Sequence, residues 1–327
     1  MRRKLYLLGT LTCLFACSEE DTAEFENVQV FQEMWTYIDE NYIYFEHKGI
    51  NWNEVRADYA PMINESLSEI ALLDIMSEMM NTLKDGHNFI NIPGTQRSYN
   101  FKEGFEIHFD LSVVKNNYLG NEFQELGFYT YGILNDQIAY IHLGEFSGVN
   151  QVHQVMQFFE NTGINGIILD IRNNPGGSGQ DAVEIVGHFI EQPTTVGYLV
   201  EKIGRPHDAI SAPLSIQATP EAPYFDVPVI LLINRGSFSA ATYLAAELKS
   251  LPNVTLLGQI TGGGGGGNQT QELSNGWLVT ISSSKMLGVN FDESIEDGIA
   301  PDIAIANDSL VLATGIDEML ERAVQEF

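Results

Sequence analysis

Apolar residues recur at helical spacing along the first part of the chain. Three stretches carry apolar positions three or four residues apart, at residues 28–42, 55–63 and 70–83. This pattern predicts a small helical domain over residues 28–92 that ends in a polar turn carrying His87. Packing into a core explains the methionines and aromatic residues of these stretches.

The pattern then changes to short strands, and after them to alternating strands and helices. Between residues 100 and 140, apolar and polar positions alternate as in strands, for example over Phe105–Phe109. Continuous apolar runs predict buried strands at residues 166–171, 228–233 and 254–257, and the segments between and after them predict helices at 151–161, 181–190, 240–249 and 317–326. This order predicts an α/β core over residues 93–327 with a mostly parallel sheet of β-α-β units and a strand-rich insert around 100–135.

One segment of this core, residues 228–248, carries a candidate nucleophile. Its sequence, PVILLINRGSFSAATYLAAEL, reads as a buried strand, a tight turn and a helix of small residues. Ser239 would lie at the first turn of that helix, where backbone N–H groups and the positive end of the helix dipole favour developing negative charge. Serine is also a common helix cap, so the local sequence alone favours a structural role for Ser237 or Ser239.

Two further segments could complete a site with this serine. The residues RNNPGGSG, 172–179, follow a buried strand, and the bare N–H groups of Gly176 and Gly177 could hold an oxyanion, although an ordinary glycine turn is an equal alternative. His87 could act as a general base, although a lone histidine in a turn is more often structural.

The later part of the chain adds a candidate acid and a glycine run. In the segment EDGIAPD, Glu296 or Asp297 could orient a histidine, and the alternative is a solvated acidic turn. The six glycines at 262–267 lack the Lys-Ser/Thr pair of a phosphate loop, so we expect a mobile or closely packed loop rather than a nucleotide site.

Four motifs in this order resemble those of the tail-specific (carboxyl-terminal-processing) and tricorn-core serine peptidase family. They are KDGH at 84–87, LDIRNNPGG at 169–177, NRGSFSAA at 234–241 and GIAPD at 298–302. The resemblance implies a crotonase-like core, Ser239 rather than Ser237 as the nucleophile, and no cofactor or metal. It also implies an oxyanion hole made by the N–H of Ala240 with that of Gly176 or Gly177.

The chain departs from one branch of this family. The tail-specific branch has a lysine 25 residues after its serine, where this chain has Gly264, so a Ser–Lys dyad would need Lys285 to reach the site. The tricorn-like branch uses a histidine and a glutamate, which here correspond to His87 and Glu296, with Asp297 as the rival acid. That branch carries a serine immediately before its histidine, where this chain has Gly86. Many members of the family carry a PDZ domain between this histidine and the core. Here the segment from His87 to the strand predicted at Ile138 is too short for a full PDZ domain, which we expect to be absent or reduced to a few strands.

The N-terminus and the net charge indicate where such a protein works. Residues 1–16 have a basic head and an apolar run before Cys17, which resembles a bacterial lipoprotein signal, with a plain secretory signal as the alternative. We expect an exported protein anchored to the outer membrane by a lipid on Cys17, through an acidic tether over 17–27 that resembles the tags of surface-exposed lipoproteins. The two cysteines are Cys13, which lies in this leader, and Cys17, which would carry the lipid, so we expect neither a disulfide nor a cysteine nucleophile in the mature chain. The net charge of −28 disfavours nucleic acid as a partner.

The sequence therefore predicts a serine endopeptidase that cleaves peptides or unfolded proteins through an acyl-enzyme on Ser239. His87 would move the proton and Glu296 would orient His87. The alternative is a non-catalytic lipoprotein that binds lipophilic ligands or peptides on the same fold, as a pseudoenzyme. A third possibility is an esterase that uses the same triad.

Overall fold

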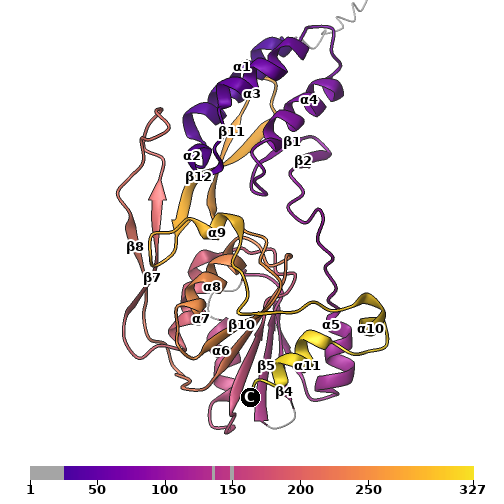
Figure 1. Ribbon diagram of the computed structural model, residues 1–327, viewed down its shortest axis with the longest axis vertical. Coiled ribbons are helices and arrows are strands. Elements are labelled where there is room, and N and C mark those ends of the chain that lie inside the picture. Colours follow the sequence, from indigo (N-terminus) through magenta and orange to yellow (C-terminus); the bar gives the residue numbers. More distant parts are fainter. Residues whose placement is uncertain (1–25, 135–136, 148–150) are drawn as a thin grey trace, which may run out of the picture.

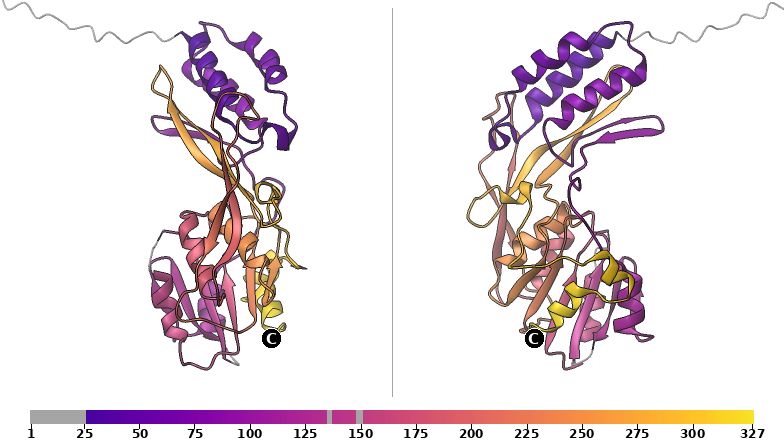
Figure 2. Two further views of the ribbon diagram at one scale, coloured as in Figure 1. Left: turned by 90° about the vertical axis from the view of Figure 1, so that its left-hand side faces the viewer. Right: turned by 45° about the vertical axis from the view of Figure 1, so that its right-hand side comes forward.

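The computed structural model describes residues 26–134, 137–147 and 151–327. Two lobes are joined by long strands and by one extended segment of chain (Figures 1 and 2). The upper lobe holds the N-terminal helices on an antiparallel sheet, and the lower lobe holds the predominantly parallel sheet between layers of helices. The predicted leader and Cys17 lie outside the described residues.

The upper-lobe helices form where the apolar periodicity predicts them. In α1 (Asn27–Asn41) the buried residues include Val30, Met34 and Ile38, each one helical turn from the next. The helix α4 (Glu69–Asn81) begins at Ser68, whose hydroxyl accepts the N–H of Ala71 as an N-cap. Between them lie α2 (Phe45–Lys48), α3 (Trp52–Tyr59) and the 3₁₀ turn η1 (Ala60–Met62).

These helices do not bury their apolar faces against one another alone. They share a core with the hairpin of β11 (Gly266–Glu272) and β12 (Leu278–Leu287), which contributes Trp277, Val279 and Ile281. In Figure 1 the helices lie along the upper part of this hairpin. Because the helical region and residues 273–287 form one core, we expect them to fold together. The domain boundary at residue 92 stays a prediction.

The sheet of the upper lobe is antiparallel, so the prediction of a mostly parallel sheet holds for only one part of the molecule. Within the described residues its strands are paired in the order β2-β1-β12-β7-β8, with β11 on β12. They are β1 (Phe89–Ile92), β2 (Thr95–Ser98), β7 (Thr194–Glu201), β8 (Leu214–Ala218), β11 (Gly266–Glu272) and β12 (Leu278–Leu287). The sequence analysis did not predict β11, GGNQTQE, because this strand is polar and largely exposed and so lacks an apolar run.

The lower-lobe sheet confirms the predicted buried strands. Its order is β13-β10-β9-β6-β5-β4-β3, parallel from β13 to β5 and antiparallel from β5 to β3. Both faces of β6 and β9 are covered: Ile167 and Leu169 point into one core, and Ile168 points into the other. The strands are β3 (Gln124–Leu126), β4 (Tyr129–Leu134), β5 (Ile138–Leu143), β6 (Gly166–Asp170), β9 (Val229–Ile233), β10 (Val254–Gly258) and β13 (Ile303–Ala304). The crotonase-like description stays a prediction.

Helices cover both faces of this sheet. The helices of the lower lobe are α5 (Leu111–Val114), the π-helical turn η2 (Lys115–Leu119), α6 (Gln151–Phe159), α7 (Gly179–Gly187), α8 (Ala240–Lys249), α9 (Ser294–Asp297), α10 (Ser309–Ala313) and α11 (Glu318–Val324). The helices α6, α7 and α8 pack on one face of the sheet, and α11 packs on the other. Among the residues that the structure describes, no helix has both the length and the hydropathy to span a bilayer.

The predicted strand Phe105–Phe109 is wrong. Residues 105–110 are irregular and pair with no strand among the described residues, as part of the extended segment that joins the lobes in Figure 2. The aromatic side chains of this segment pack on loops instead of a sheet face: the ring of Phe105 lies under the guanidinium of Arg235, and that of Phe109 under Arg172. Alternation alone therefore gave the wrong element, because a strand also needs a partner edge.

Candidate active site

Ser239 lies in the turn between β9 and α8, as the sequence predicts. It is the last residue before α8 and has φ +56° and ψ −122°, a backbone conformation that a residue with a side chain rarely adopts. Its N–H donates to the carbonyl of Gly263 at 3.0 Å, and its hydroxyl does not cap the helix. The side chain is thus held at the helix N-terminus without a capping role.

Ser237 has a different environment. Its hydroxyl donates to the carbonyl of Ile171 at 2.7 Å and accepts the N–H of Asn234 at 3.1 Å, and the residue is fully buried. These bonds tie the turn after β9 to the end of β6. The structural alternative that the sequence left open therefore fits Ser237 and not Ser239.

His87 reaches Ser239 from the upper lobe. Its Nε2 lies 3.0 Å from the Oγ of Ser239, although the two residues are 152 positions apart. For Nε2 to accept the hydroxyl proton, the ring proton must lie on Nδ1, and Nδ1 has no hydrogen-bond partner among the described residues. Burial lowers the pKa of His87, and the nearby Asp85 opposes part of that shift. The imidazole is therefore neutral near pH 7, as a general base must be.

Asp85, to which the sequence analysis gave no role, holds the histidine turn in place. One carboxylate oxygen accepts the backbone N–H of His87 at 2.8 Å, and the other accepts the hydroxyl of Ser282 in β12 at 2.8 Å. The first bond spans two residues, as in an Asx-turn, and Asp at that position before the histidine is the signal that could have identified it. The turn is thereby fixed to the central strand of the upper sheet.

The glycine run at 262–267 is the closely packed loop that the sequence offered as one alternative. Gly264 has φ +79°, and a Cβ built there would lie 2.5 Å from the ring of Phe238 and 2.9 Å from Cε1 of His87. A side chain at position 264 would therefore clash with the His87 ring in its observed position. Lys285, the other lysine considered, pairs with Glu293 at 2.5 Å and not with Ser239.

The prediction that Glu296 orients His87 is not met by a direct hydrogen bond. The buried Glu296 carboxylate accepts the N–H of Gly265 at 2.9 Å and lies 2.7 Å from Nζ of Lys48. Lys48 also donates to the carbonyl of Lys84, so Glu296 reaches the histidine turn through Lys48. Burial, and then the charge of Asp85, raise the pKa of Glu296 to about 8 against the effect of Lys48. No local sequence signal marks Lys48, which comes from α2.

The rival acid Asp297 lies further out. Its carboxylate is 3.0 Å from Nε2 of His47, and two thirds of its side chain is exposed. Asp297 and Glu296 both border a cleft of about 440 Å³, which is also lined by Phe238, Gly86 and Gly264. This cleft lies beside the Ser239–His87 pair at the junction of the lobes.

The glycine loop after β6 approaches the nucleophile closely. A Cβ on Gly176 would lie 2.7 Å from Cβ of Ser239 and 2.9 Å from the nitrogen of Ala240. The N–H of Gly176 donates to Oδ1 of Asn174 at 2.8 Å. The N–H groups of Gly177 and Ala240 bond to no acceptor in the described part of the chain. Of the two glycines considered as oxyanion donors, Gly177 is therefore the one whose N–H is open.

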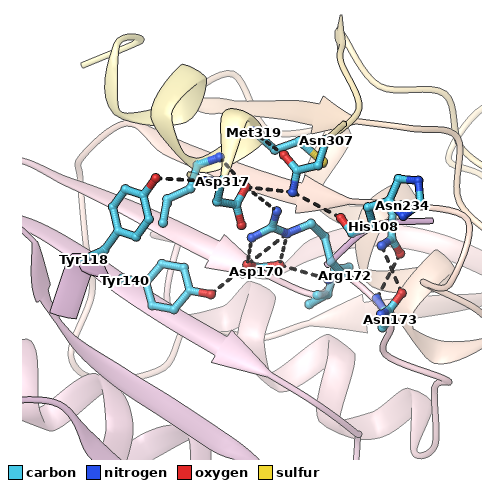
Figure 3. A network of polar contacts seen from close by, with 12 residues as sticks. His108, Tyr118, Tyr140, Asp170, Arg172, Asn173, Asn234, Asn307, Asp317 and Met319 are labelled. Atoms are coloured by element: carbon cyan, nitrogen blue, oxygen red, sulfur yellow. Dashed lines mark hydrogen bonds and ion pairs between the residues drawn. The ribbon is translucent and has the colours of Figure 1, made fainter. Parts of the chain in front are cut away.

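A buried ion network, which the sequence analysis did not identify, holds this loop. The guanidinium of Arg172 bonds to Asp170 at 2.6 Å and to Asp317 at 2.9 Å, and all three side chains are fully buried. Figure 3 shows Arg172 between the two carboxylates, with the hydroxyl of Tyr140 directed at Asp170. Beside it, the side chains of Asn173 and Asn234 bond to each other and join the glycine loop to the turn before Ser239. Two loops from different strands are thus fixed against one another.

Metal ligands do not gather at this site or elsewhere in residues 26–134, 137–147 and 151–327, where no group of three or more His, Cys, Asp or Glu side chains could hold an ion.

Comparison with known proteins identifies the family. The model of peptidase family S41 matches residues 137–305, and that of the tricorn protease C1 domain matches residues 23–81. A carboxyl-terminal-processing protease of Synechocystis is 32% identical over 167 residues, which is 50% of this chain and 37% of that protein. A Staphylococcus epidermidis protein named probable CtpA-like serine protease is 35% identical over 144 residues, 44% of this chain and 28% of that protein. This chain thus spans well under half of either relative.

A solved structure extends the likeness to almost the whole chain. The crystal structure of a candidate peptidase from Parabacteroides merdae superposes with a TM-score of 0.85 at 32% identity, covering 92% of this chain and 96% of that one. The chain belongs to peptidase family S41, and the relatives it matches are named as proteases.

Proposed function

We propose that the protein is a serine endopeptidase that cleaves peptides or unfolded protein segments through an acyl-enzyme on Ser239, with His87 as the base. The observation that carries this proposal is the 3.0 Å contact between Nε2 of His87 and Oγ of Ser239. This distance is within the range for proton transfer between a base and a nucleophile. It supports catalysis over the alternative of a binding protein for lipophilic ligands or peptides.

The proton would move between the two residues in both half-reactions. As Oγ of Ser239 attacks the scissile carbonyl, Nε2 of His87 takes the hydroxyl proton, and the imidazolium then gives it to the leaving amine. Water then attacks the acyl carbonyl as Nε2 of His87 takes its proton. The imidazolium returns that proton to Oγ of Ser239 as the bond between Oγ and the acyl carbon breaks and the acid product leaves. Because burial lowers the pKa of His87, the free histidine is ready to accept a proton near pH 7.

The oxyanion would be held by backbone N–H groups. The N–H groups of Ala240 and Gly177 bond to no acceptor within the described residues, and Ala240 begins the ten-residue helix α8. Gly177 follows Gly176, whose Cβ position is 2.7 Å from Cβ of Ser239. Fixed donors at a helix N-terminus need no reorganisation when charge develops on the carbonyl oxygen. The N–H of Gly176 would keep the loop in shape through Asn174.

Glu296 would position His87 indirectly. Its carboxylate fixes Gly265 in the glycine loop and Lys48 in α2, and Lys48 bonds to the histidine turn at Lys84. The close fit of Gly264 against the His87 ring supports the histidine-using branch of the family, because a lysine at 264 would occupy the same space. This assignment treats Glu296 as a positioning residue, not as one that touches the reacting atoms.

We also propose that the protein is exported and anchored to the outer membrane by a lipid on Cys17. The basic head, the apolar run and the cysteine at the end of the leader support this placement. Growth with a labelled fatty acid should label the wild-type protein but not a Cys17→Ala variant. Equal labelling of both forms would contradict the anchor.

The peptidase activity is tested with an unfolded, fluorescently labelled protein and a matched ester substrate. The wild-type protein should release labelled fragments in an amount that increases with time. Ser239→Ala should reduce the rate of cleavage by at least about a thousandfold. Ser215→Ala, at an exposed serine on β8, is the control and should cleave as the wild type does. Cleavage that survives Ser239→Ala would overturn the proposal, and cleavage of the ester alone would favour an esterase.

A further inference from the structure

A second cavity lies beside α8, along the helix face that follows Ser239. It encloses about 200 Å³ and has apolar walls from Val183, Ile216 and Met286. Gly179, Tyr243 and Glu247 also line it. The cleft beside Phe238 and Gly86 has a different lining, so the two hollows are separate.

The cavity is next to both halves of the candidate active site. Ser239, Tyr243 and Glu247 are four residues apart, so they share one face of α8, and the N–H of Tyr243 donates to the carbonyl of Ser239 at 3.0 Å. A Cβ on Gly179, two residues after Gly177, would lie 3.5 Å from the ring of Tyr243. The cavity thus lies between the start of α7, which follows the glycine loop, and α8, which follows the nucleophile.

Glu247 is the unusual member of this lining. It is fully buried, and neither of its carboxyl oxygens has a hydrogen-bond partner within the described residues. Burial raises the pKa of this carboxyl well above its usual value. A buried acid without a hydrogen-bond partner destabilises the fold, so a bound ligand that supplies the partner would account for its presence.

The geometry fits a long cationic side chain. Glu247 lies about 12 Å along the helix axis from Ser239, at 1.5 Å per residue, and a helical side chain leans toward the N-terminus, which brings its carboxyl back toward the nucleophile. The apolar stem of a lysine or arginine would pack on Val183, Ile216 and Met286, and its charged end would reach the carboxyl. The net charge of −28 would also attract basic peptides.

We propose that Glu247 is a specificity-determining residue that selects a basic side chain, lysine or arginine, on the acyl side of the scissile bond. The inference rests on the proposed function of Ser239. When the cavity is empty the carboxyl holds its proton, and entry of the cation releases that proton to solvent and leaves an ion pair.

The test compares two phosphonate inactivators that differ only at the side chain, one with a 4-aminobutyl group and one with a butyl group. A small fluorophosphonate without a side chain serves as a third probe of Ser239 itself. The rate of inactivation is measured for the wild type, for Glu247→Gln, for Glu247→Leu and for Glu78→Gln, an exposed glutamate on α4 that serves as the control.

We expect the aminobutyl probe to inactivate wild type and Glu78→Gln at least about tenfold faster than the butyl probe. Glu247→Gln and Glu247→Leu should bring the two rates within about threefold of each other by slowing only the aminobutyl probe. The fluorophosphonate should label all four proteins at similar rates, because Ser239 is unchanged.

Two results would overturn the inference in distinguishable ways. If the fluorophosphonate labels the protein but Glu247→Leu keeps the wild-type preference, or the wild type has no preference, then only the role of Glu247 falls. If no probe labels the wild type, the proposed function of Ser239 falls and the role of Glu247 falls with it. A purely structural Glu247 would change thermal stability and leave the ratio of the two rates unchanged.

Discussion

Two polar clusters of this protein, one around Arg172 and one formed by His87 and Ser239, are built in opposite ways. In the first, all three nitrogens of the Arg172 guanidinium are bonded to Asp170 or Asp317. In the second, His87 and Ser239 bond to each other, and Nδ1 of His87 has no partner among the described residues. The guanidinium of the first cluster has all its nitrogens bonded within the protein, whereas the second cluster keeps hydrogen-bonding groups that a substrate could use.

This difference indicates how the fold divides its work. The Arg172 cluster and the Asn173–Asn234 pair fix the glycine loop and the nucleophile turn against each other. The open groups at Ser239, Ala240 and Gly177 then lie on a support that does not need to move. A preorganised site of this kind stabilises developing charge without reorganisation during the reaction.

The largest expected effect separates the two serines of the nucleophile turn. Ser239→Ala should lower peptidase activity by at least about a thousandfold and leave the free energy of unfolding nearly unchanged, because its hydroxyl contacts His87 and does not cap α8. Ser237→Ala should lower the free energy of unfolding by about 1–3 kcal/mol, because it removes two buried hydrogen bonds. Turnover and urea unfolding measured on both variants check the pair. A Ser237→Ala variant that folds normally but loses all activity would reverse the two assignments.

The second prediction concerns the ion network. Arg172→Met leaves Asp170 and Asp317 buried without their cation, so the free energy of unfolding should fall by about 3–5 kcal/mol. Arg97→Met removes a pair with Asp74 in which both side chains are more than a third exposed, and it should cost less than about 1 kcal/mol. Urea unfolding followed by circular dichroism measures both. Equal losses would mean that the buried network has no special structural role.

The third prediction tests the close fit between the glycine loop and the histidine. Gly264→Ala places a Cβ against His87 and Phe238 and should lower kcat/KM by about ten- to a hundredfold through displacement of the base. Gly276→Ala is matched to it, since Gly276 has φ +81° but open space around its Cβ. Both variants should lose about 1–2 kcal/mol of stability from the positive φ. Unchanged activity in Gly264→Ala would contradict the contact between Gly264 and His87.

The smallest effect is the pH dependence. Because the pKa of His87 is lowered from 6.5, kcat/KM should rise with pH through a midpoint below 6.5 and then level off. The folded protein also binds fewer protons at His87 than the unfolded chain does, so the His87 contribution to stability is lost as the pH falls below about 6.5. A pH profile of initial rates from pH 5 to 8 measures the first effect. A midpoint above 6.5 would contradict the buried, neutral histidine.

The sequence predicted the parts of this molecule that local patterns can encode. Apolar runs predicted the buried strands β6, β9 and β10, and a run of small residues predicted the helix α8. The family resemblance singled out Ser239 as the candidate nucleophile and His87 as the candidate base. The polar strand β11 has no apolar run, so this strand of the upper sheet was missed. The pairing of Arg172 with Asp317 joins residues 145 positions apart, and no local pattern encodes it.

The same limit applies within the candidate site. The family pattern indicated an acid near residue 296, but the partner of Glu296 is Lys48, which comes from the second helix of the chain. The sequence also left Gly176 and Gly177 as equal alternatives, and the bond from Gly176 to Asn174 distinguishes them. Such distinctions depend on which groups are already bonded in the folded chain, which is a property of tertiary structure.

The most direct test of the central claim is to locate the adduct formed by a fluorophosphonate. After the probe has reacted with the folded protein, digestion and mass spectrometry should find the phosphonyl group on Ser239 and not on Ser237. A His87→Ala variant that unfolds as the wild type does should carry little or no adduct, because the serine has lost its base. An adduct on Ser237, or equal labelling of Ser239 in the His87→Ala variant, would contradict the account.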